Sequence, residues 1–178
     1  MNFSGQSCLE LNSALASRVK ELQKFRSEFF GRLSELLEDR EEIRVVGDRF
    51  VFQSELLFEK GSANLGQEGN EQLKQLFITL DDIAKTIPND INWVLQVEGH
   101  TDSIPIRAGK YRDNWHLSTE RALSVVRFLI DKGIEAKRLS ATGYGEFQPL
   151  SKLDNNLSLE EKNSKNRRIE LKIKQRII

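Results

Sequence analysis

The sequence predicts an α/β fold, an α+β sandwich in which helices pack on one face of a mixed sheet, with a long helix ahead of it. Residues 9–42 contain no proline and repeat apolar side chains at three- and four-residue steps, as an amphipathic helix does. From residue 43 onward, β-rich runs alternate with helix-like runs. Such alternation is typical of a sheet that is covered by helices.

The long helix is expected to run from Leu9 to about Glu42. Gly31 inside it costs about 1 kcal/mol relative to alanine, which weakens the pattern without cancelling it. The spacing fits a coiled coil with another chain, and it fits equally a helix that folds back onto its own domain. We therefore predict an N-terminal helix in residues 1–42 and a domain in residues 43–178. The apolar stripe consists of Leu11, Leu15, Val19, Leu22, Phe25, Phe29, Leu33 and Leu36.

The domain is expected to open with a β-hairpin and to continue with helices between strands. Gly47-Asp48 separates two β-rich runs and fits a two-residue hairpin turn. Gly133 fits the C-terminal stop of the second helix. The expected strands are 43–46, 49–53, 91–98, 137–142 and 167–174; the expected helices are about 67–86 and 118–132; a polar surface loop with room for one helical turn spans 152–165.

The segment 97–122 holds the residues that point most directly to function. A strand-like run leads into Gly99-His-Thr-Asp102, so that Asp102 would lie just past the carboxyl end of a strand, where ligand groups often lie in α/β sheets. Ser118 is expected to cap the next helix. Arg121 would then lie in the first turn, where a cation opposes the helix dipole and free N–H groups favour an anion.

Asp102 and Arg121 carry opposite charges and could hold a zwitterion across the loop. The carboxylate would take an ammonium group of the ligand, and the guanidinium would take a ligand carboxylate in a bidentate contact. A salt bridge between Asp102 and Arg121 that only ties the loop down explains the same pattern equally well. The spacing alone leaves both interpretations open.

Four ordered motifs resemble the OmpA-like peptidoglycan-binding domain, and the resemblance covers roughly residues 44–173. Within that family, the loop Asp102-Ser-Ile-Pro-Ile106 and the run Asn114-Trp-His-Leu-Ser118 look most similar to the MotB-like branch. The motifs are Gly99-His-Thr-Asp102, Asn114-x-x-Leu117-Ser118-x-x-Arg121-Ala122, Gly143-Tyr-Gly-Glu146-x-x-Pro149 and Asn166-Arg167-Arg168.

The resemblance implies a β-α-β-α-β core and a non-catalytic role in binding cell-wall peptidoglycan, which anchors an envelope protein or complex. It also implies a location in the periplasm or cell envelope of a Gram-negative-type bacterium. In the family, the residues that match Asp102 and Arg121 grip the amino and carboxylate groups of diaminopimelate in the stem peptide. Neighbouring residues in a strand face opposite sides, so only one of Arg167 and Arg168 can face the pocket. The resemblance favours Arg167. The other matching pocket residues are Thr101, Asn114, Leu117 and Arg167.

Composition and charge argue against several other classes of protein. Lys+Arg and Asp+Glu each total 27, so no net field attracts nucleic acid or an acidic membrane. No apolar run reaches the length of about 18 residues that a transmembrane helix needs, and residues 1–8 lack the basic and apolar regions of a secretion signal. Because the family works outside the cytoplasmic membrane, we expect a truncated chain or an anchor upstream. The single Cys8 excludes an internal disulfide.

We expect neither a metal site nor a catalytic centre, and therefore no cofactor and no enzymatic activity. His100, Asp102 and His116 are metal-ligand types, but nothing in their spacing fixes them on one side of the loop. Ser103 and Ser118 lie near histidines without a catalytic motif around them. Three apolar residues near the site are expected to pack rather than to contact a ligand: Phe58, Leu65 and Ile104. Trp115 could stack on a ligand, although packing against the loop is the commoner role of such a residue.

Two other functions stay open. A MotB-like, stator-associated component would form a homodimer through the N-terminal helix and place two wall-binding domains side by side. An ion-conducting stator also needs a membrane helix with an ionisable residue, which this sequence does not contain. A metal-dependent peptidoglycan hydrolase would bind metal and release soluble muropeptides.

Overall fold

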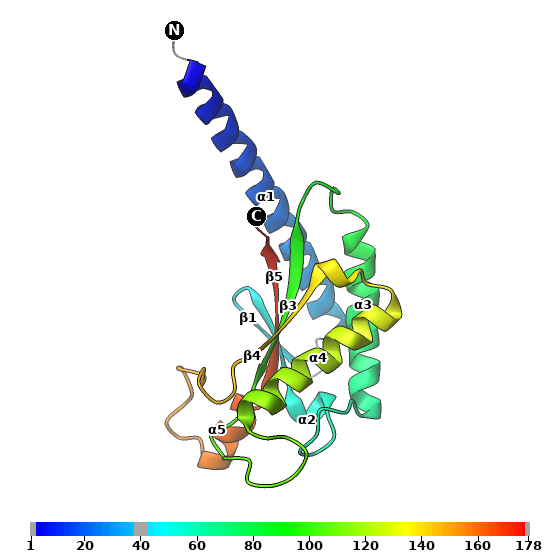
Figure 1. Ribbon diagram of the computed structural model, residues 1–178, viewed down its shortest axis with the longest axis vertical. Coiled ribbons are helices and arrows are strands. Elements are labelled where there is room, and N and C mark those ends of the chain that lie inside the picture. Colours follow the sequence, from blue (N-terminus) through cyan, green and yellow to red (C-terminus); the bar gives the residue numbers. More distant parts are fainter. Residues whose placement is uncertain (1–2, 38–42, 177–178) are drawn as a thin grey trace.

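A computed structural model describes residues 3–37 and 43–176, which form one five-stranded mixed sheet and the helices around it. The strands are β1 (Ile43–Val46), β2 (Arg49–Gln53), β3 (Trp93–His100), β4 (Leu139–Gly143) and β5 (Arg168–Gln175); the helices are α1 (Phe3–Leu37), α2 (Ser54–Leu57), α3 (Gln67–Ala84), α4 (Asn114–Lys132), α5 (Leu159–Asn166) and the 3-10 helix η1 (Ala136–Arg138). The strand order is β1-β2-β5-β3-β4 (Figure 1). Strands β3 and β4 run parallel and the other neighbours antiparallel, which confirms the predicted mixed sheet.

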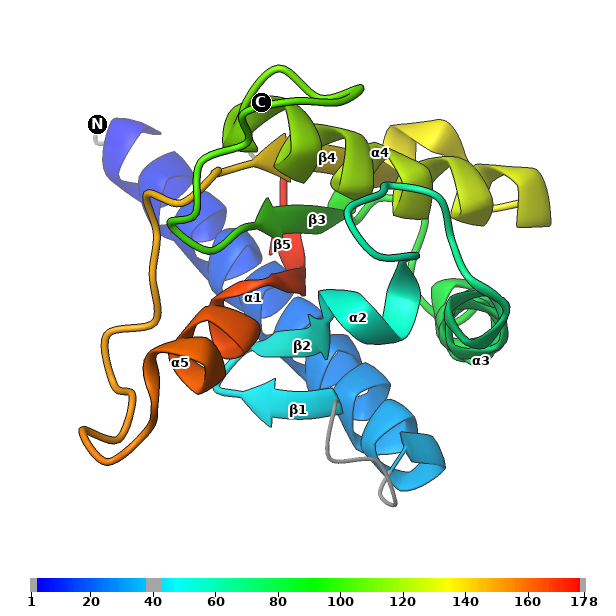
Figure 2. The ribbon, with the colours of Figure 1, turned by 90° about the horizontal axis from the view of Figure 1, so that it is seen from below.

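Helices α1, α3 and α4 share one hydrophobic core with the sheet, and α1 crosses the strands diagonally (Figure 2). Alternate strand residues face this core because side chains alternate between the two faces of a strand. Leu95 of β3 and Leu171 of β5 are fully buried there. They lie among buried residues from each helix, such as Leu33 of α1, Leu76 of α3 and Leu129 of α4.

The two halves of α1 have different surroundings. Its C-terminal half folds back onto the domain, where Phe29 is fully buried and Phe30 stacks on Phe50 of β2 with 5.9 Å between ring centroids. Its N-terminal half extends beyond the sheet (Figure 1). The helix begins at Phe3, earlier than predicted, and the predicted end near Glu42 lies outside the described residues. Within the described part of the chain, no helix has the length and apolar character that a membrane crossing requires.

Helix α4 begins earlier than predicted, and this corrects two inferences. Its N-cap is Asp113, whose side chain accepts a hydrogen bond from the backbone N–H of His116 at 2.8 Å. Ser118 is therefore not the cap but an internal residue, and its hydroxyl accepts from the N–H of Gly145 at 3.0 Å. Arg121 lies beyond the first turn, so the argument from a cation opposing the helix dipole is wrong. Aspartate caps a helix as well as serine does, and the sequence offers both close together.

Two glycines let α4 lie directly on the sheet. A Cβ atom on Gly99 of β3 would lie 2.1 Å from the carbonyl oxygen of Ser118, and one on Gly143 of β4 would lie 2.1 Å from Oγ1 of Thr119. No larger residue fits at such distances. The glycines therefore fix the first half of α4 against the carboxyl ends of β3 and β4.

Two short helices differ from the prediction. Helix α2 follows β2 without a break. Helix α5 occupies residues Leu159–Asn166, where a surface loop with room for one helical turn was predicted, and Ser158 and Glu161 form a capping box at its start. Both helices border the cavity at the carboxyl end of β3.

Candidate ligand-binding site

A cavity of about 650 Å³ lies at the carboxyl end of β3, bordered by α2, the first half of α4 and α5. Its walls come from segments that are far apart in the sequence, so the site exists only in the folded chain. The structure brings all six residues expected from the sequence into the lining of this cavity: Thr101, Asp102, Asn114, Leu117, Arg121 and Arg167.

Asp102 is held in place by two donors and is only 8% exposed. Its Oδ1 accepts a hydrogen bond from the N–H of Ile104 at 3.0 Å. Its Oδ2 accepts from Nη1 of Arg167 at 2.8 Å. Among the described residues, the guanidinium partner of Asp102 is thus Arg167 and not Arg121. The plain salt bridge between Asp102 and Arg121 that the sequence left open is therefore wrong.

Arg167 connects three parts of the cavity wall. Besides Asp102, its guanidinium donates to Glu160 of α5 at 3.0 Å and to Glu55 of α2. Burial lowers the pKa of Arg167, but hydrogen bonds to Asp102, Glu55 and Glu160 outweigh it, so the pKa is raised overall. Because three carboxylates already share this cation, we assign Arg167 to holding Asp102 in position. Sequence reasoning missed Glu55 and Glu160, since no local pattern singles them out.

Arg121 is the opposite case: a buried cation without a carboxylate partner in the described chain. Its side chain is 5% exposed. Nε donates to the carbonyl oxygen of Ser62 at 2.8 Å, and the guanidinium lies over the ring of Phe58, 5.2 Å from its centroid. Burial lowers its pKa, because removal from water disfavours the charged form. A guanidinium in this state favours an anion that can reach it through the cavity.

The other expected residues shape the loop around Asp102. Asn114 Nδ2 donates to the carbonyl oxygen of Ile104 at 3.1 Å and to Oε2 of Glu146 at 2.5 Å. The hydroxyl of Thr101 donates to the carbonyl oxygen of Asp102 at 2.9 Å. Leu117 packs in a small buried cluster beside the cavity. These contacts fix the direction in which the carboxylate of Asp102 points.

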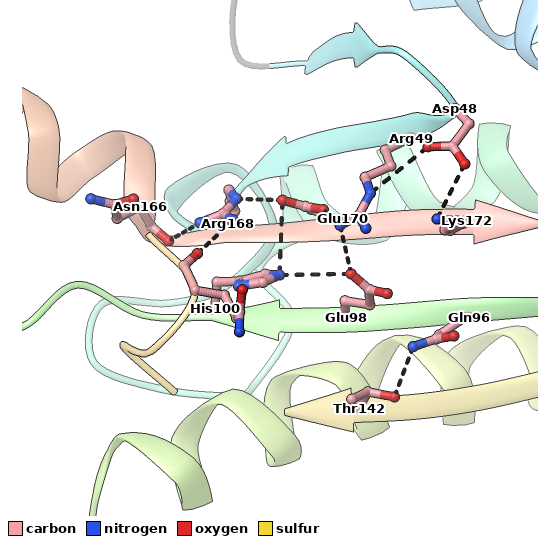
Figure 3. A network of polar contacts seen from close by, with 11 residues as sticks. Asp48, Arg49, Gln96, Glu98, His100, Thr142, Asn166, Arg168, Glu170 and Lys172 are labelled. Atoms are coloured by element: carbon pink, nitrogen blue, oxygen red, sulfur yellow. Dashed lines mark hydrogen bonds and ion pairs between the residues drawn. The ribbon is translucent and has the colours of Figure 1, made fainter. Parts of the chain in front are cut away.

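An ion network connects the ends of β3 and β5 (Figure 3). Glu98 and Glu170 are paired across these strands, and Arg49 of β2 donates to both of them, at 2.9 Å to Glu98. Arg168 donates to Glu170 at 2.6 Å. His100 lies 3.8 Å from Glu170. Since Asp102 follows His100 by two residues and Arg167 precedes Arg168, the network supports both members of the Asp102–Arg167 pair.

Residues of the types that bind metal ions gather in this network. They are not the set His100, Asp102 and His116 that was considered in the sequence analysis. Among the described residues, the cluster with metal-like spacing is Glu98, His100 and Glu170. Both of its carboxylates already accept hydrogen bonds from guanidinium groups. The charge of these carboxylates is therefore compensated within the protein.

Replacing Glu170 by glutamine is expected to destabilise the fold by roughly 2–3 kcal/mol at pH 7, because it removes charge-assisted hydrogen bonds. Burial raises the pKa of Glu170, but hydrogen bonds and charges of Arg49 and Arg168 outweigh it and lower the pKa overall. Such a carboxyl group stabilises the fold above its unfolded pKa of about 4.3, and this stability is lost as the pH falls through the lower folded value.

Urea unfolding of wild type and Glu170→Gln between pH 7 and pH 3 measures this effect. We expect the difference between the two proteins to shrink as the solution is acidified. Glu71→Gln, on the exposed face of α3, is the control and should stay within about 0.5 kcal/mol of wild type. A difference for Glu170→Gln that is the same at both ends of the pH range would contradict the assignment.

The family model of the OmpA family matches residues 57–167, a range that contains all six expected site residues. The chain belongs to the OmpA family. This confirms the resemblance that the sequence motifs indicated. Glu55 lies just before the matched range, which is a further reason why sequence motifs did not reveal it.

Two proteins of Bacillus subtilis are similar in sequence to this chain. The chain is 38% identical over 125 residues to the protein YtxE of Bacillus subtilis (strain 168), which covers 70% of this chain and 47% of that relative. It is 42% identical over 78 residues to motility protein B of the same organism, covering 43% of this chain and 28% of the relative. The chain thus spans less than half the length of these curated relatives.

Solved structures with the same fold include two of related proteins. A putative MotB-like protein from Desulfovibrio vulgaris superimposes with a TM-score of 0.67 at 26% identity, over 93% of this chain and 98% of the other. The cell wall anchor of the T6SS from Pseudomonas aeruginosa gives a TM-score of 0.64 at 28% identity, over 82% and 98%. The OmpA-family chain described here therefore shares its fold with a MotB-like protein and a cell wall anchor.

Proposed function

We propose that this chain binds cell-wall peptidoglycan without catalysis, through the diaminopimelate of the stem peptide, and so anchors an envelope protein or complex to the wall. The observation that carries the proposal is the buried guanidinium of Arg121, which lines the cavity beside Asp102 and has no carboxylate partner among the described residues. The likeness to a cell wall anchor and to MotB-like proteins supports the same reading.

The two charged residues have separate roles in this proposal. Arg121 takes the side-chain carboxylate of diaminopimelate, which replaces the hydration that burial has removed from the guanidinium. Asp102 takes the ammonium group at the same centre. Each of its oxygens accepts one hydrogen bond in the chain, and a carboxylate has room for about four. Arg167 holds the Asp102 carboxylate in a fixed orientation, so that the pocket presents both signs to a zwitterion.

Simple binding accounts for the cavity better than hydrolysis does. A metal-dependent hydrolase needs a metal with open positions, and a serine or cysteine hydrolase needs a nucleophile with a partnered base. Among the described residues that line the cavity, none is a histidine or a cysteine. Incubation with purified cell wall should therefore retain the protein on the pellet and release no soluble muropeptide, and elemental analysis should find no metal in stoichiometric amount.

A pull-down with purified cell wall tests the proposal. Asp102→Asn removes the charge of the carboxylate with little change in shape, and it should abolish retention on diaminopimelate-containing wall. Arg127→Ala on the exposed side of α4 removes a cation elsewhere on the same helix and should leave retention unchanged. Retention of Asp102→Asn at the wild-type level would overturn the assignment of Asp102 to the ligand.

The exposed half of α1 supports a second candidate, a MotB-like component that forms a homodimer through this helix. Four apolar side chains on this half are exposed in the described chain. Exposed stripes of this kind often mark a protein interface. Their exposed fractions are 71% for Leu9, 61% for Leu11, 49% for Leu15 and 45% for Val19.

Size-exclusion chromatography with light scattering tests the dimer. We expect the wild-type chain to elute as a dimer and a Leu11→Glu, Leu15→Glu double variant to elute as a monomer, because charges in a helical seam disfavour pairing. The test uses substitutions instead of removing α1, since Phe29 and Leu33 of this helix belong to the core. A monomeric wild type at all concentrations would contradict this candidate and leave the wall-binding proposal intact.

A further inference from the structure

Two aromatic side chains lie exposed next to the cavity without lining it. Trp115 of α4 is 49% exposed, and Phe147, in the segment after β4, is 57% exposed. Their rings stack on one another, with 5.2 Å between centroids and 25° between planes. A Cβ atom on Gly145 would lie 3.5 Å from each side chain, so the backbone there supports both. We call Trp115 and Phe147 the aromatic platform.

Hydrogen bonds connect the chain neighbours of the aromatic platform to the cavity. Asn114 lines the cavity and directly precedes Trp115. The Nδ2 of Asn114 donates both to Glu146, which directly precedes Phe147, and to the carbonyl oxygen of Ile104. Ile104 lines the cavity as well, and its side chain is 54% exposed. Trp115 and Phe147 therefore each directly follow one of two residues, Asn114 and Glu146, that are hydrogen-bonded to each other at the edge of the cavity.

We propose that the aromatic platform binds a sugar ring of the peptidoglycan glycan strand while the stem peptide occupies the cavity. This proposal rests on the proposed function, because the peptide and the sugar belong to one polymer. The C–H face of a pyranose ring is apolar and its edge is polar, which matches an aromatic face on a polar surface. Arg112 and His116, which lie within three positions of Trp115 in the chain, are exposed polar residues.

The small size of the platform favours a sugar ring over a protein partner. A stable protein interface buries roughly 800 Å² on each side and uses some 20–30 residues. Two stacked rings supply only a fraction of that area. A single pyranose ring, in contrast, covers about the area of one indole face. The stacking also fixes the rings before the ligand arrives, so that little rotamer entropy is lost on binding.

Titration with two ligands tests the proposal: a diaminopimelate stem peptide, and the same peptide attached to its disaccharide. We expect wild type to bind the disaccharide-peptide roughly threefold to tenfold more tightly, the range that an aromatic contact gives. Trp115→Ala and Phe147→Ala should lose this preference and keep the wild-type affinity for the free peptide. Ile78→Ala on α3, a residue that is 42% exposed, is the matched control and should keep the preference.

Tryptophan emission gives an independent readout on the wild-type protein. Trp93 is 3% exposed and lies in the core, so a change in emission on adding ligand reports Trp115. We expect the disaccharide-peptide to shift the emission and the free peptide to leave it unchanged.

Three results would overturn the proposal. Equal wild-type affinity for the two ligands would show that the sugar makes no contact, while peptide binding would leave the proposed function standing. A Trp115→Ala variant that weakens both ligands by the same factor would show that the platform only supports the cavity; Phe147→Ala, in a loop, checks that this is not a loss of fold. No binding of either ligand to wild type would overturn the proposed function and this inference together.

Discussion

Replacing Arg121 by glutamine is expected to lower the affinity for a diaminopimelate stem peptide by about 100-fold, roughly 3 kcal/mol, the contribution of one or two charge-assisted hydrogen bonds. The side chain is 5% exposed and has no carboxylate partner in the described chain, so the ligand would supply the counter-charge. Glutamine keeps a hydrogen-bond donor near Ser62 and removes the charge. Calorimetric titration measures the difference.

Two further variants separate charge from geometry. Arg121→Lys keeps the positive charge but cannot form the bidentate contact, so its affinity should fall between those of wild type and Arg121→Gln. Arg127→Ala, on the exposed side of the same helix, should bind as wild type does. If Arg121→Gln binds the stem peptide as tightly as wild type while it stays folded, Arg121 is a structural cation and the assignment is wrong.

Replacing Gly99 by alanine is expected to destabilise the fold by about 3 kcal/mol or more, since overpacking at a site that cannot relax is among the most costly substitutions. The new Cβ atom would lie 2.1 Å from the carbonyl oxygen of Ser118, which is backbone and cannot rotate away. Helix α4 would have to move off β3, and with it Asn114, Leu117 and Arg121. Urea unfolding followed by circular dichroism measures the loss.

Gly31→Ala is the matched control for this substitution. Gly31 lies in the interior of α1, and no atom outside its own helix lies within 4 Å of a Cβ added there. Alanine should therefore stabilise the protein by roughly 0.5–1 kcal/mol through the lower entropy of the unfolded chain. A Gly99→Ala variant within 1 kcal/mol of wild type would contradict the close packing of α4 on the sheet.

The features that depend on local chemistry could be predicted from the sequence. Alternating apolar residues predicted the strands. Gly133 was predicted to end the second helix, and it is the C-cap of α4 with a φ of 118°. The hairpin turn at Gly47 also follows from residue type, since its φ of 61° is one that glycine adopts readily. Most pocket residues were predicted from the resemblance of the motifs to the OmpA family, and the match to that family is confirmed.

The features that depend on the folded arrangement could not be predicted. The sequence analysis predicted Ser118 as the cap of α4, whereas the folded helix begins four residues earlier and is capped by Asp113. The motifs contain two arginines that could pair with Asp102, namely Arg121 and Arg167. The folded chain pairs Asp102 with Arg167, which lies directly before β5. The contact between Glu55 and Arg167 joins residues 112 positions apart, which no spacing rule reports.

Calorimetric titration of the wild-type chain with a diaminopimelate stem peptide and with its lysine counterpart tests the central claim most directly. Lysine lacks the carboxylate that Arg121 is proposed to hold, and the two peptides are otherwise alike. We expect binding to the first peptide and a loss of about 100-fold or more with the second. Equal affinity for both peptides, or no binding to either, would contradict a zwitterion site formed by Asp102 and Arg121.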